Sequence, residues 1–145
     1  MIDSKTPDEA AVRQILDDRR QALHRKDAAA LLAHDAPDIL SYDLAPPLRS
    51  VGSDPASVQA WLATWDGPID CELHEVSIET GDGIAISTGL NRMRGTKTDG
   101  VRVDLWFRTT TGYRKIADRW QVVHDHASVP FYMDGSDRAA LDLKP

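Results

Sequence analysis

The hydrophobic pattern of this chain changes its period once, near Gly67-Pro68, and this change restricts the possible folds more than any other feature. Before it, apolar residues recur at helical spacing; after it, apolar and polar residues alternate, as in strands with one buried face. Glycine-rich turns divide the second part into successive strands. Helices followed by hairpins predict an α+β fold in which a strongly curved, cone-shaped antiparallel sheet wraps around about three N-terminal helices.

The helices are predicted from their start signals. Thr6, Pro7 and Glu9 form a capping box with proline in the first turn. Asp27 and Asp54 are good caps for two shorter helices. The predicted helices cover residues 7–23, 28–33 and 55–65, with one strand over residues 39–43 before the third helix.

Four more strands are predicted after the third helix, which gives the order α-α-β-α-β-β-β-β. The alternation changes parity near His74-Glu75, which predicts a β-bulge there. We expect a single domain over residues 1–145, with a core over residues 6–131 and a polar tail over residues 132–145. The predicted strands cover residues 69–78, 84–94, 101–108 and 113–131, with turns at residues 81–83, 95–100 and 109–112.

Composition and charge exclude several classes of protein. The net charge of −6 and the scattered 17 Lys and Arg residues argue against a nucleic-acid partner. No apolar run approaches the roughly 20 residues that span a bilayer, and residues 1–5 carry no secretory signal, so we expect a cytoplasmic protein without a membrane partner. Cys71 is the only cysteine and is expected to be a buried structural thiol. No phosphate-binding loop is present, and no cofactor is expected.

The element order and two stretches of sequence resemble the nuclear transport factor 2-like superfamily, which includes ketosteroid isomerases and SnoaL-like polyketide cyclases. The stretch from Lys26-Asp27 through Ser41-Tyr42-Asp43 to Gly52 is similar to the isomerase segment that carries the general base. Val103-Asp104-Leu105-Trp106 is similar to the strand with the protonated oxyanion-hole aspartate. The resemblance implies Asp43 as the base, Asp104 as the hydrogen-bond donor, and a homodimer formed through the outer face of the sheet.

Three further stretches resemble a group of SnoaL-like bacterial proteins of unassigned activity. They are Asp43-Leu44-Ala45-Pro46-Pro47-Leu48, Leu90-Asn91-Arg92-Met93 and His124-Asp125-His126-Ala127-Ser128-Val129-Pro130-Phe131. The resemblance covers residues 6–131 and implies one pocket for a small-molecule ligand. It indicates the fold more specifically than the reaction.

Arg19 departs from the family pattern. It occupies the position of the isomerase's oxyanion-hole tyrosine, and it interrupts the apolar stripe of the first helix, four residues from both Ile15 and Leu23. We therefore predict that Arg19 forms an ion pair with Asp104 in the pocket, which favours an anionic or enolisable ligand. The alternative is that Arg19 extends to solvent or to a surface acid.

Both candidate aspartates also have structural alternatives. Asp43 could be an ordinary turn aspartate before Pro46. Asp104 shares a strand face with Trp106 and Arg108, whereas the opposite face is the more apolar. The face that carries Asp104 could therefore point outward or toward another subunit.

His124 and His126 stand two residues apart on the last predicted strand and therefore share a face. We expect both to line the pocket with Trp120, and His124 to be a polar catalytic partner. Two imidazoles and an acid could also bind a metal, but the sequence fixes no third ligand, and no metal site is predicted. Asp125 is expected to point the other way, at the edge or an interface of the sheet.

The aromatic residues could form a slot for a flat ligand, although most of them are expected in the core. Tyr42 and Asp43 are adjacent in a strand and point to opposite faces unless the strand end twists. The candidate pocket-lining residues are Tyr42, Trp61, Trp65, Trp106, Trp120 and His126.

Together these residues predict a cofactor-independent enzyme that abstracts a proton next to a carbonyl. Asp43 would be the base, with Arg19, Asp104 and His124 as polar partners. An isomerase, a cyclase or a dehydratase would use the same groups. The rival hypothesis is a non-catalytic ligand-binding or association module, because the fold also serves as the association domain of calmodulin-dependent kinase.

Overall fold

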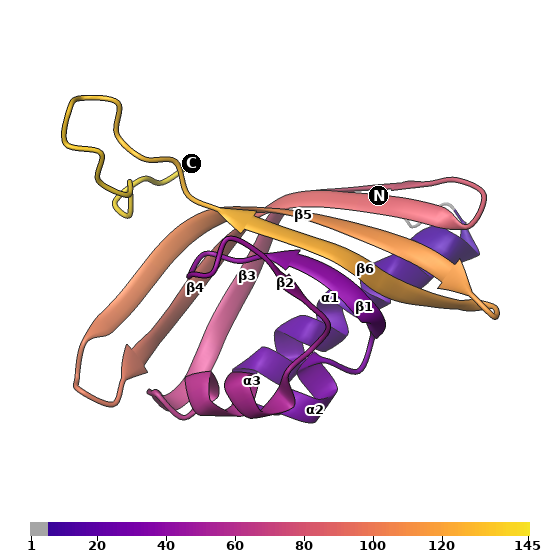
Figure 1. The fold of residues 1–145 in the computed structure, drawn as a ribbon, viewed down its shortest axis with the longest axis horizontal. Helices are drawn as coiled ribbons and strands as arrows, with labels where there is room; N and C mark the ends of the chain where they lie inside the picture. Colours follow the sequence, from indigo (N-terminus) through magenta and orange to yellow (C-terminus); the bar gives the residue numbers. More distant parts are fainter. Residues whose placement is uncertain (1–5) are drawn as a thin grey trace.

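The structure is a computed structural model, and it describes residues 6–145. The expectation that residues 1–5 carry no secretory signal lies outside this part of the chain. Within residues 6–145, no helix has the length and apolar character needed to cross a membrane. The helices are α1 (Pro7–His24), α2 (Ala28–Leu31) and α3 (Pro55–Leu62), and the strands are β1 (Asp35–Tyr42), β2 (Ser50–Val51), β3 (Trp65–Thr80), β4 (Ile84–Lys97), β5 (Arg102–Ile116) and β6 (Arg119–Ser128) (Figure 1).

The first helix begins as its sequence predicts. The side chain of Thr6 accepts a hydrogen bond from the backbone N–H of Glu9 at 3.0 Å, and Pro7 occupies the first turn. Val12 and Ile15 lie on the face that packs into the core. This face holds α1 against the concave side of the sheet.

The strands described in residues 6–145 form one open sheet in the order β2-β1-β6-β5-β4-β3. Strands β3 to β6 pair antiparallel with their neighbours in sequence, but β1 pairs with β6 in parallel. The expectation of an entirely antiparallel sheet is therefore wrong. The chain leaves β1, passes through β2, α3 and the hairpins, and returns beside β1 only at β6, which runs in the same direction as β1.

The β-bulge predicted near His74-Glu75 is confirmed. The register between β3 and β4 shifts between His74 and Ser77, and Glu75 has a left-handed φ of 52°. As a result, Leu73 before the bulge and Val76 after it both face the concave side, where they line the same hollow. The change of parity in the sequence is the cause of this arrangement.

The predicted turn over residues 109–112 is wrong, because these residues lie inside β5. The hairpin turn between β5 and β6 is at Ala117-Asp118, where both residues have left-handed φ values, 50° and 64°. Gly112 favours a turn when the sequence is considered alone, but it pairs with β6 inside the sheet. The strand predicted over residues 113–131 is therefore divided between β5 and β6.

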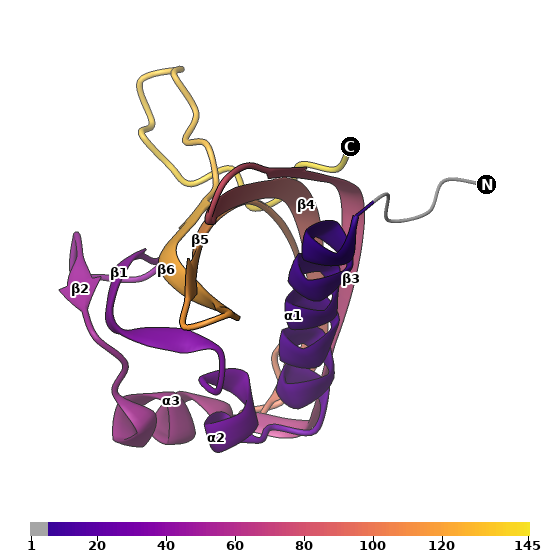
Figure 2. The ribbon, with the colours of Figure 1, turned by 90° about the vertical axis from the view of Figure 1, so that its right-hand side faces the viewer.

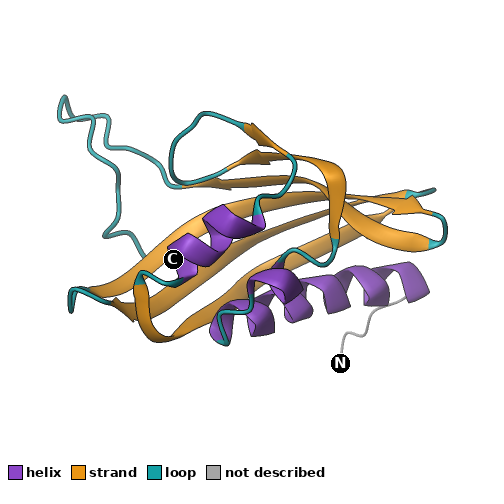
Figure 3. Ribbon diagram, turned by 60° about the horizontal axis from the view of Figure 1, so that its bottom comes forward, coloured by secondary structure: helices purple, strands orange, loops and turns teal. Residues whose placement is uncertain are grey.

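The helices cover the concave face of the sheet, as Figures 2 and 3 show. The first helix packs mainly against β3, and α2 packs against α1 and α3. This arrangement confirms the α+β cone, with a sheet that is mixed and not closed. One core cluster contains Val12, Ile15, Ile39, Ala85, Tyr113, Trp120 and Val122, and the other contains Ala28, Leu62, Trp65, Ile69 and Met93.

Residues 129–145, for the most part the predicted polar tail, form an arm with its own short hairpin. Phe131 pairs with Ala139 in an antiparallel bridge, and the backbone N–H of Tyr132 donates to the carbonyl oxygen of Arg138 at 2.8 Å. Figure 1 shows the arm projecting from the end of β6, beyond the sheet. Its exposed large apolar side chains are those of Phe131, Met133, Leu141 and Leu143.

Gly95 in β4 packs against the ring of Trp65, and this contact leaves no room for a side chain. A Cβ at Gly95 would lie 2.9 Å from two ring carbons of Trp65, which is only 3% exposed. Gly95→Ala should therefore lower the free energy of unfolding by about 1 to 3 kcal/mol, measured by urea denaturation. Gly81→Ala is the control, because its Cβ would meet its nearest atom at 3.7 Å, an ordinary contact. Equal losses in the two variants would contradict this packing.

Candidate functional site

Arg19 on α1 and Asp125 on β6 form an ion pair on the concave side of the sheet. Nη1 of Arg19 donates to Oδ1 of Asp125 at 3.2 Å, and Nη2 donates to Oδ2. Oδ1 also accepts a hydrogen bond from the hydroxyl of Thr111 at 2.9 Å. The two charged side chains are 23% and 22% exposed, so both are largely removed from water. Arg19 thus pairs with a carboxylate inside the fold, but the predicted partner, Asp104, is wrong.

A β-bulge in β6 explains why this carboxylate faces inward. Gly112 and Tyr113 are consecutive in β5, but their partners in β6 are His124 and Val122. Val123 is therefore an extra residue on β6 without an opposite partner. One extra residue reverses the face of every later side chain in the strand. The sequence-based expectation that Asp125 points away from the pocket is wrong for this reason.

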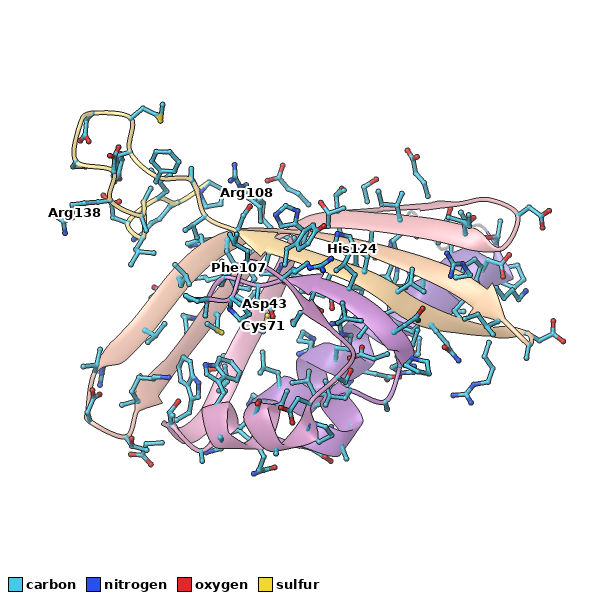
Figure 4. The ribbon with its side chains drawn as sticks, viewed as in Figure 1. Asp43, Cys71, Phe107, Arg108, His124 and Arg138 are labelled. Carbon is cyan, nitrogen blue, oxygen red and sulfur yellow. The ribbon has the colours of Figure 1, made fainter. Side chains whose placement is uncertain are left out.

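The same bulge places His124 and His126 on the outer face, so the prediction that they line the pocket is wrong. The ring of Tyr42 makes edge-to-face contacts with both, at centroid distances of 4.9 and 5.3 Å. Nδ1 of His124 lies 2.7 Å from the carbonyl oxygen of Leu40 and donates to it. Figure 4 shows His124 on the side of β6 away from the helices. Tyr42 therefore belongs to the outer face and not to the pocket.

Asp43 follows β1 directly and lies within the electrostatic reach of both Arg19 and Asp125. Partial burial raises the pKa of Asp43 above its ordinary value of 3.8, the charge of Asp125 raises it further, and Arg19 opposes the shift. The side chain still reaches solvent. A carboxylate that is accessible and more basic than usual is suited to accept a proton from a bound molecule.

Asp35, at the start of β1, is a site residue that the sequence analysis missed. Burial raises the pKa of Asp35, and the nearby charge of Arg19 opposes the shift. Oδ2 accepts a hydrogen bond from the hydroxyl of Ser53 at 2.8 Å, whereas Oδ1 is buried without a partner in the described part of the chain. No motif marks Asp35 in the sequence. Asp125, Asp43 and Asp35 thus place three carboxylates around one guanidinium.

Buried polar side chains on the concave face of β4 and β5 are paired across the strands. The hydroxyls of Ser87 and Tyr113 are 2.8 Å apart, and the side-chain amide of Asn91 donates to the hydroxyl of Thr109 at 2.7 Å. Burial raises the pKa of Tyr113, which keeps its phenol neutral. The sequence analysis missed these residues, because small polar side chains at alternate strand positions do not distinguish an inner face from an outer one.

Asp104 lies on the outer face and pairs with Arg92, with Nε to Oδ1 at 2.9 Å and Nη2 to Oδ2 at 2.8 Å. The hydrogen bonds from Arg92 lower the pKa of Asp104, so it is an ionised carboxylate and not a protonated donor. Trp106 shares this face, with its ring centroid 5.6 Å from the guanidinium carbon of Arg92 and 4.8 Å from the ring of His74. The predicted pocket roles of Asp104 and Trp106 are wrong, and the outward alternative is confirmed.

The other tryptophans have mainly structural contacts. Trp65 and Trp120 are 3% and 7% exposed and belong to the two core clusters. The indole N–H of Trp120 donates to Asp8 at 3.0 Å, which ties β6 to the start of α1. Trp61 is 40% exposed and packs edge-on against Trp65. The core alternative is therefore confirmed for Trp65 and Trp120, and a pocket role for Trp61 stays a prediction.

Two hollows adjoin the concave face beside α1. A groove of about 460 Å³ lies between α1 and the bulged part of β3, and a void of about 20 Å³ lies behind it. Leu16, Leu73 and Val76 line both hollows. The wall of the void includes Ser87, Asn91 and Thr109, and a void of this size has room for about one water molecule.

No described residue set supports metal or thiol chemistry. Within residues 6–145, no group of three or more His, Cys, Asp or Glu side chains is arranged to hold a metal ion. Burial raises the pKa of Cys71 to about 11, and its sulfur lies 3.8 Å from Oδ1 of Asn91. The thiol therefore stays protonated at neutral pH and acts as part of the packed interior.

The sequence that forms this α+β cone matches a known family. A family model described as a SnoaL-like domain matches residues 12–132. The chain belongs to the SnoaL-like family. None of the curated proteins matches the chain.

Solved structures extend the likeness of this SnoaL-like protein to the arm. A nuclear transport factor 2-like protein of unknown function from Pseudomonas putida KT2440 is 29% identical, with a TM-score of 0.86 over 99% of this chain and 100% of that one. A candidate dehydratase of the same family from Streptomyces avermitilis is 18% identical, with a TM-score of 0.72 over 85% and 97%. A ketosteroid isomerase-like protein from Erwinia carotovora atroseptica SCRI1043 is 20% identical, with a TM-score of 0.66 over 82% and 93%. The last two show a shared fold.

Removing one member of the Arg19–Asp125 pair should leave the other charge unpaired in a poorly solvated place. Asp125→Leu and Arg19→Leu should each lower the free energy of unfolding by on the order of 3 kcal/mol. The double variant Arg19→Leu/Asp125→Leu should recover much of that loss, because it removes both charges. Urea denaturation of the four proteins gives the coupling energy.

The control for this cycle is Arg20→Leu on the same helix. Arg20 pairs with Asp17, and their side chains are 37% and 43% exposed, more than those of Arg19 and Asp125, so the loss of Arg20 should cost about 0.5 kcal/mol or less. Strictly additive losses at Arg19 and Asp125 would contradict the coupling.

The raised pKa of Asp43 also predicts a dependence of stability on pH. The folded protein holds the Asp43 proton more tightly than the unfolded chain does, so the ionised carboxylate opposes folding at pH 7. Asp43→Asn should therefore raise the urea midpoint at pH 7. The gain should fade as the pH is lowered through the raised pKa of Asp43 to the ordinary value of 3.8. The exposed Asp38→Asn serves as the control, and an equal gain there would contradict the assignment.

Proposed function

We propose that this protein is a cofactor-independent enzyme that abstracts a proton from a carbon next to a carbonyl group. Asp43 is the base, and the substrate is an uncharged apolar or aromatic molecule bound on the concave side of the sheet. Membership of the SnoaL-like family and the likeness to an isomerase-like fold support a pocket protein of this type. An isomerase, a cyclase or a dehydratase would each begin with this step.

The observation that carries the proposal is the position of Asp43 beside the Arg19–Asp125 pair. Its carboxylate reaches solvent and has a raised pKa. Asp43 follows Tyr42, which lies on the outer face, so the alternation of side chains directs Asp43 to the concave side. A carboxyl pKa closer to neutrality makes proton abstraction from carbon less unfavourable. The outer-face carboxylate Asp104 has a lowered pKa and lacks this property.

Arg19 is a second catalytic residue in this mechanism, because it stabilises the charge that forms on the substrate oxygen. Two of its nitrogens are already occupied by Asp125, whose charge balances the guanidinium. The N–H groups not used in this pair can donate to the oxygen of an enolate that forms beside them. With Asp35 and Asp43 also nearby, carboxylates outnumber cations. The excess of negative charge favours an uncharged substrate over an anionic ligand, which the sequence also allows.

A second candidate function, an association module, is favoured by the exposed apolar side chains of the arm. The two functions are not exclusive, because the arm and the concave site lie on different parts of the molecule (Figures 1 and 4). Only the enzyme proposal requires Asp43 to be a base.

The test is deuterium exchange at carbon, which needs no knowledge of the final product. Cyclic ketones, aromatic polyketides and steroids are incubated with the protein in D₂O, and loss of the α-proton signal is followed by NMR. Asp43→Asn should slow the catalysed exchange of an active compound by about 10² to 10⁴-fold while its affinity is kept. Asp38→Asn should exchange at the normal rate. Exchange that persists in Asp43→Asn would refute Asp43 as the base.

A further inference from the structure

Asn91 on β4 and Thr109 on β5 form a polar pair that does not use all of its hydrogen-bonding groups. Asn91 is 7% exposed, and its side-chain amide donates to the hydroxyl of Thr109 at 2.7 Å. Among residues 6–145, the side-chain oxygen of Asn91 meets only the thiol of Cys71, a weak donor at 3.8 Å. The second amide hydrogen of Asn91 and the hydroxyl hydrogen of Thr109 have no acceptor in the same part of the chain. Buried polar groups normally have partners, so these groups are free to bind another molecule.

The polar pair borders the void of about 20 Å³, which has room for one hydroxyl or carbonyl oxygen. None of the described side chains that line the void is charged. An ion in this place would lose its water without gaining a counter-ion, which is unfavourable. An uncharged oxygen, by contrast, can form hydrogen bonds with both Asn91 and Thr109. The void therefore suits the oxygen of a neutral molecule.

The backbone around the void departs from regular strand geometry. Glu75, in the bulge of β3, has a left-handed φ of 52°, which is costly for a residue other than glycine. Gly89 lies on β4 beside this bulge, and a Cβ there would lie 3.3 Å from the carbonyl oxygen of His74 and 3.6 Å from Cγ2 of Val76. Bulges and strained residues are enriched beside binding sites. The bulge and the missing side chain of Gly89 together leave the space that forms the void.

The groove of about 460 Å³ between α1 and β3 adjoins this void. Leu16, Leu73 and Val76 line both hollows, so these apolar side chains separate one from the other. None of the three is fully buried. The volume of the groove lies within the range of small-molecule sites, about 300 to 1,000 Å³.

The groove lies on the side of α1 turned away from the concave site around Asp43. Its residues on α1 that are three or four apart share one face of the helix, and Arg19 lies about half a turn away from this face. Figure 2 shows α1 running beside β3. The two charged residues that line the groove have opposite signs, so the groove has no net charge to attract an ion. The residues of this helix face are Ala10, Arg13, Gln14 and Asp17.

We propose that the groove binds a small, uncharged, apolar molecule that carries one hydroxyl or carbonyl group. The oxygen of this molecule occupies the void and bonds to Asn91 and Thr109, while its apolar body rests on Leu16, Leu73 and Val76. The oxygen enters when one of the two leucines changes rotamer, a fast motion for a side chain that is not fully buried. Phenols and small cyclic alcohols or ketones have this chemistry. This inference does not rest on the proposed proton transfer, because Asp43 has no part in it.

Two probes that differ by one oxygen atom test the site. The affinities of p-cresol and toluene are measured by NMR titration of protein with labelled leucine and valine methyl groups. p-Cresol should bind about tenfold more tightly than toluene, because only its hydroxyl can bond to the polar pair. Both probes should shift the methyl signals of Leu16, Leu73 and Val76. Thr109→Val keeps the shape of the side chain without its hydroxyl, and should weaken p-cresol about tenfold without weakening toluene.

Matched variants separate this site from other surfaces of the protein. Thr110→Val makes the same change at the adjacent position of β5, which points to the opposite face, and should leave both affinities unchanged. Gly89→Ala should weaken p-cresol more than toluene, because the added methyl group narrows the void. Asp43→Asn should bind p-cresol normally, which distinguishes the groove from the concave site. Unfolding midpoints show that each variant is folded.

Several results would overturn the proposal. They are the absence of p-cresol binding, equal affinities for p-cresol and toluene, equal weakening by Thr109→Val and Thr110→Val, and loss of p-cresol binding in Asp43→Asn.

Discussion

The Arg19–Asp125 ion pair is the interaction on which the rest of the site depends. It joins the first helix to the last strand across the concave side, and a guanidinium so poorly exposed requires an acid. The bidentate hydrogen bonds, with a third from Thr111 to Asp125, offset the cost of removing both charges from water. Because Asp125 neutralises Arg19, the attraction of Arg19 for the Asp43 carboxylate is too weak to cancel the effect of desolvation on the pKa of Asp43. The raised pKa of Asp43 is therefore a consequence of the pairing of Arg19 with Asp125.

Much of the fold follows from local signals in the sequence. The cap at Thr6 and the bulge at Glu75 are set by a few neighbouring residues, and each is visible as a motif or as a change of parity. Arg19 is visible for a related reason, because an arginine inside an apolar stripe must find a partner or leave the core. The sequence could therefore predict that Arg19 binds an acid. It could not predict which acid, because that depends on strand pairing.

The predictions that the structure contradicts concern strands whose hydrophobic pattern is compatible with more than one register in the sheet. Val122 and Val123 are both apolar, so the alternation in β6 fits either face, and the extra residue leaves no mark in the sequence. The turn at Ala117-Asp118 lacks glycine, although both residues adopt left-handed φ values. The parallel pairing of β1 with β6 joins segments about 80 residues apart. Only the assembled sheet decides such long-range pairing.

The bulge in β6 and the arginine on α1 require each other. Without the extra residue, His124 and His126 would face the concave side. Arg19 would then lie near two imidazoles, which can become cations, and would lack the carboxylate of Asp125. Asp125, the acid that neutralises Arg19, would then face outward. With the bulge, Asp125 faces inward and pairs with Arg19, whereas His124 and His126 face outward beside Tyr42. One backbone irregularity thus decides which ionisable side chains of β6 face the concave site and which face outward.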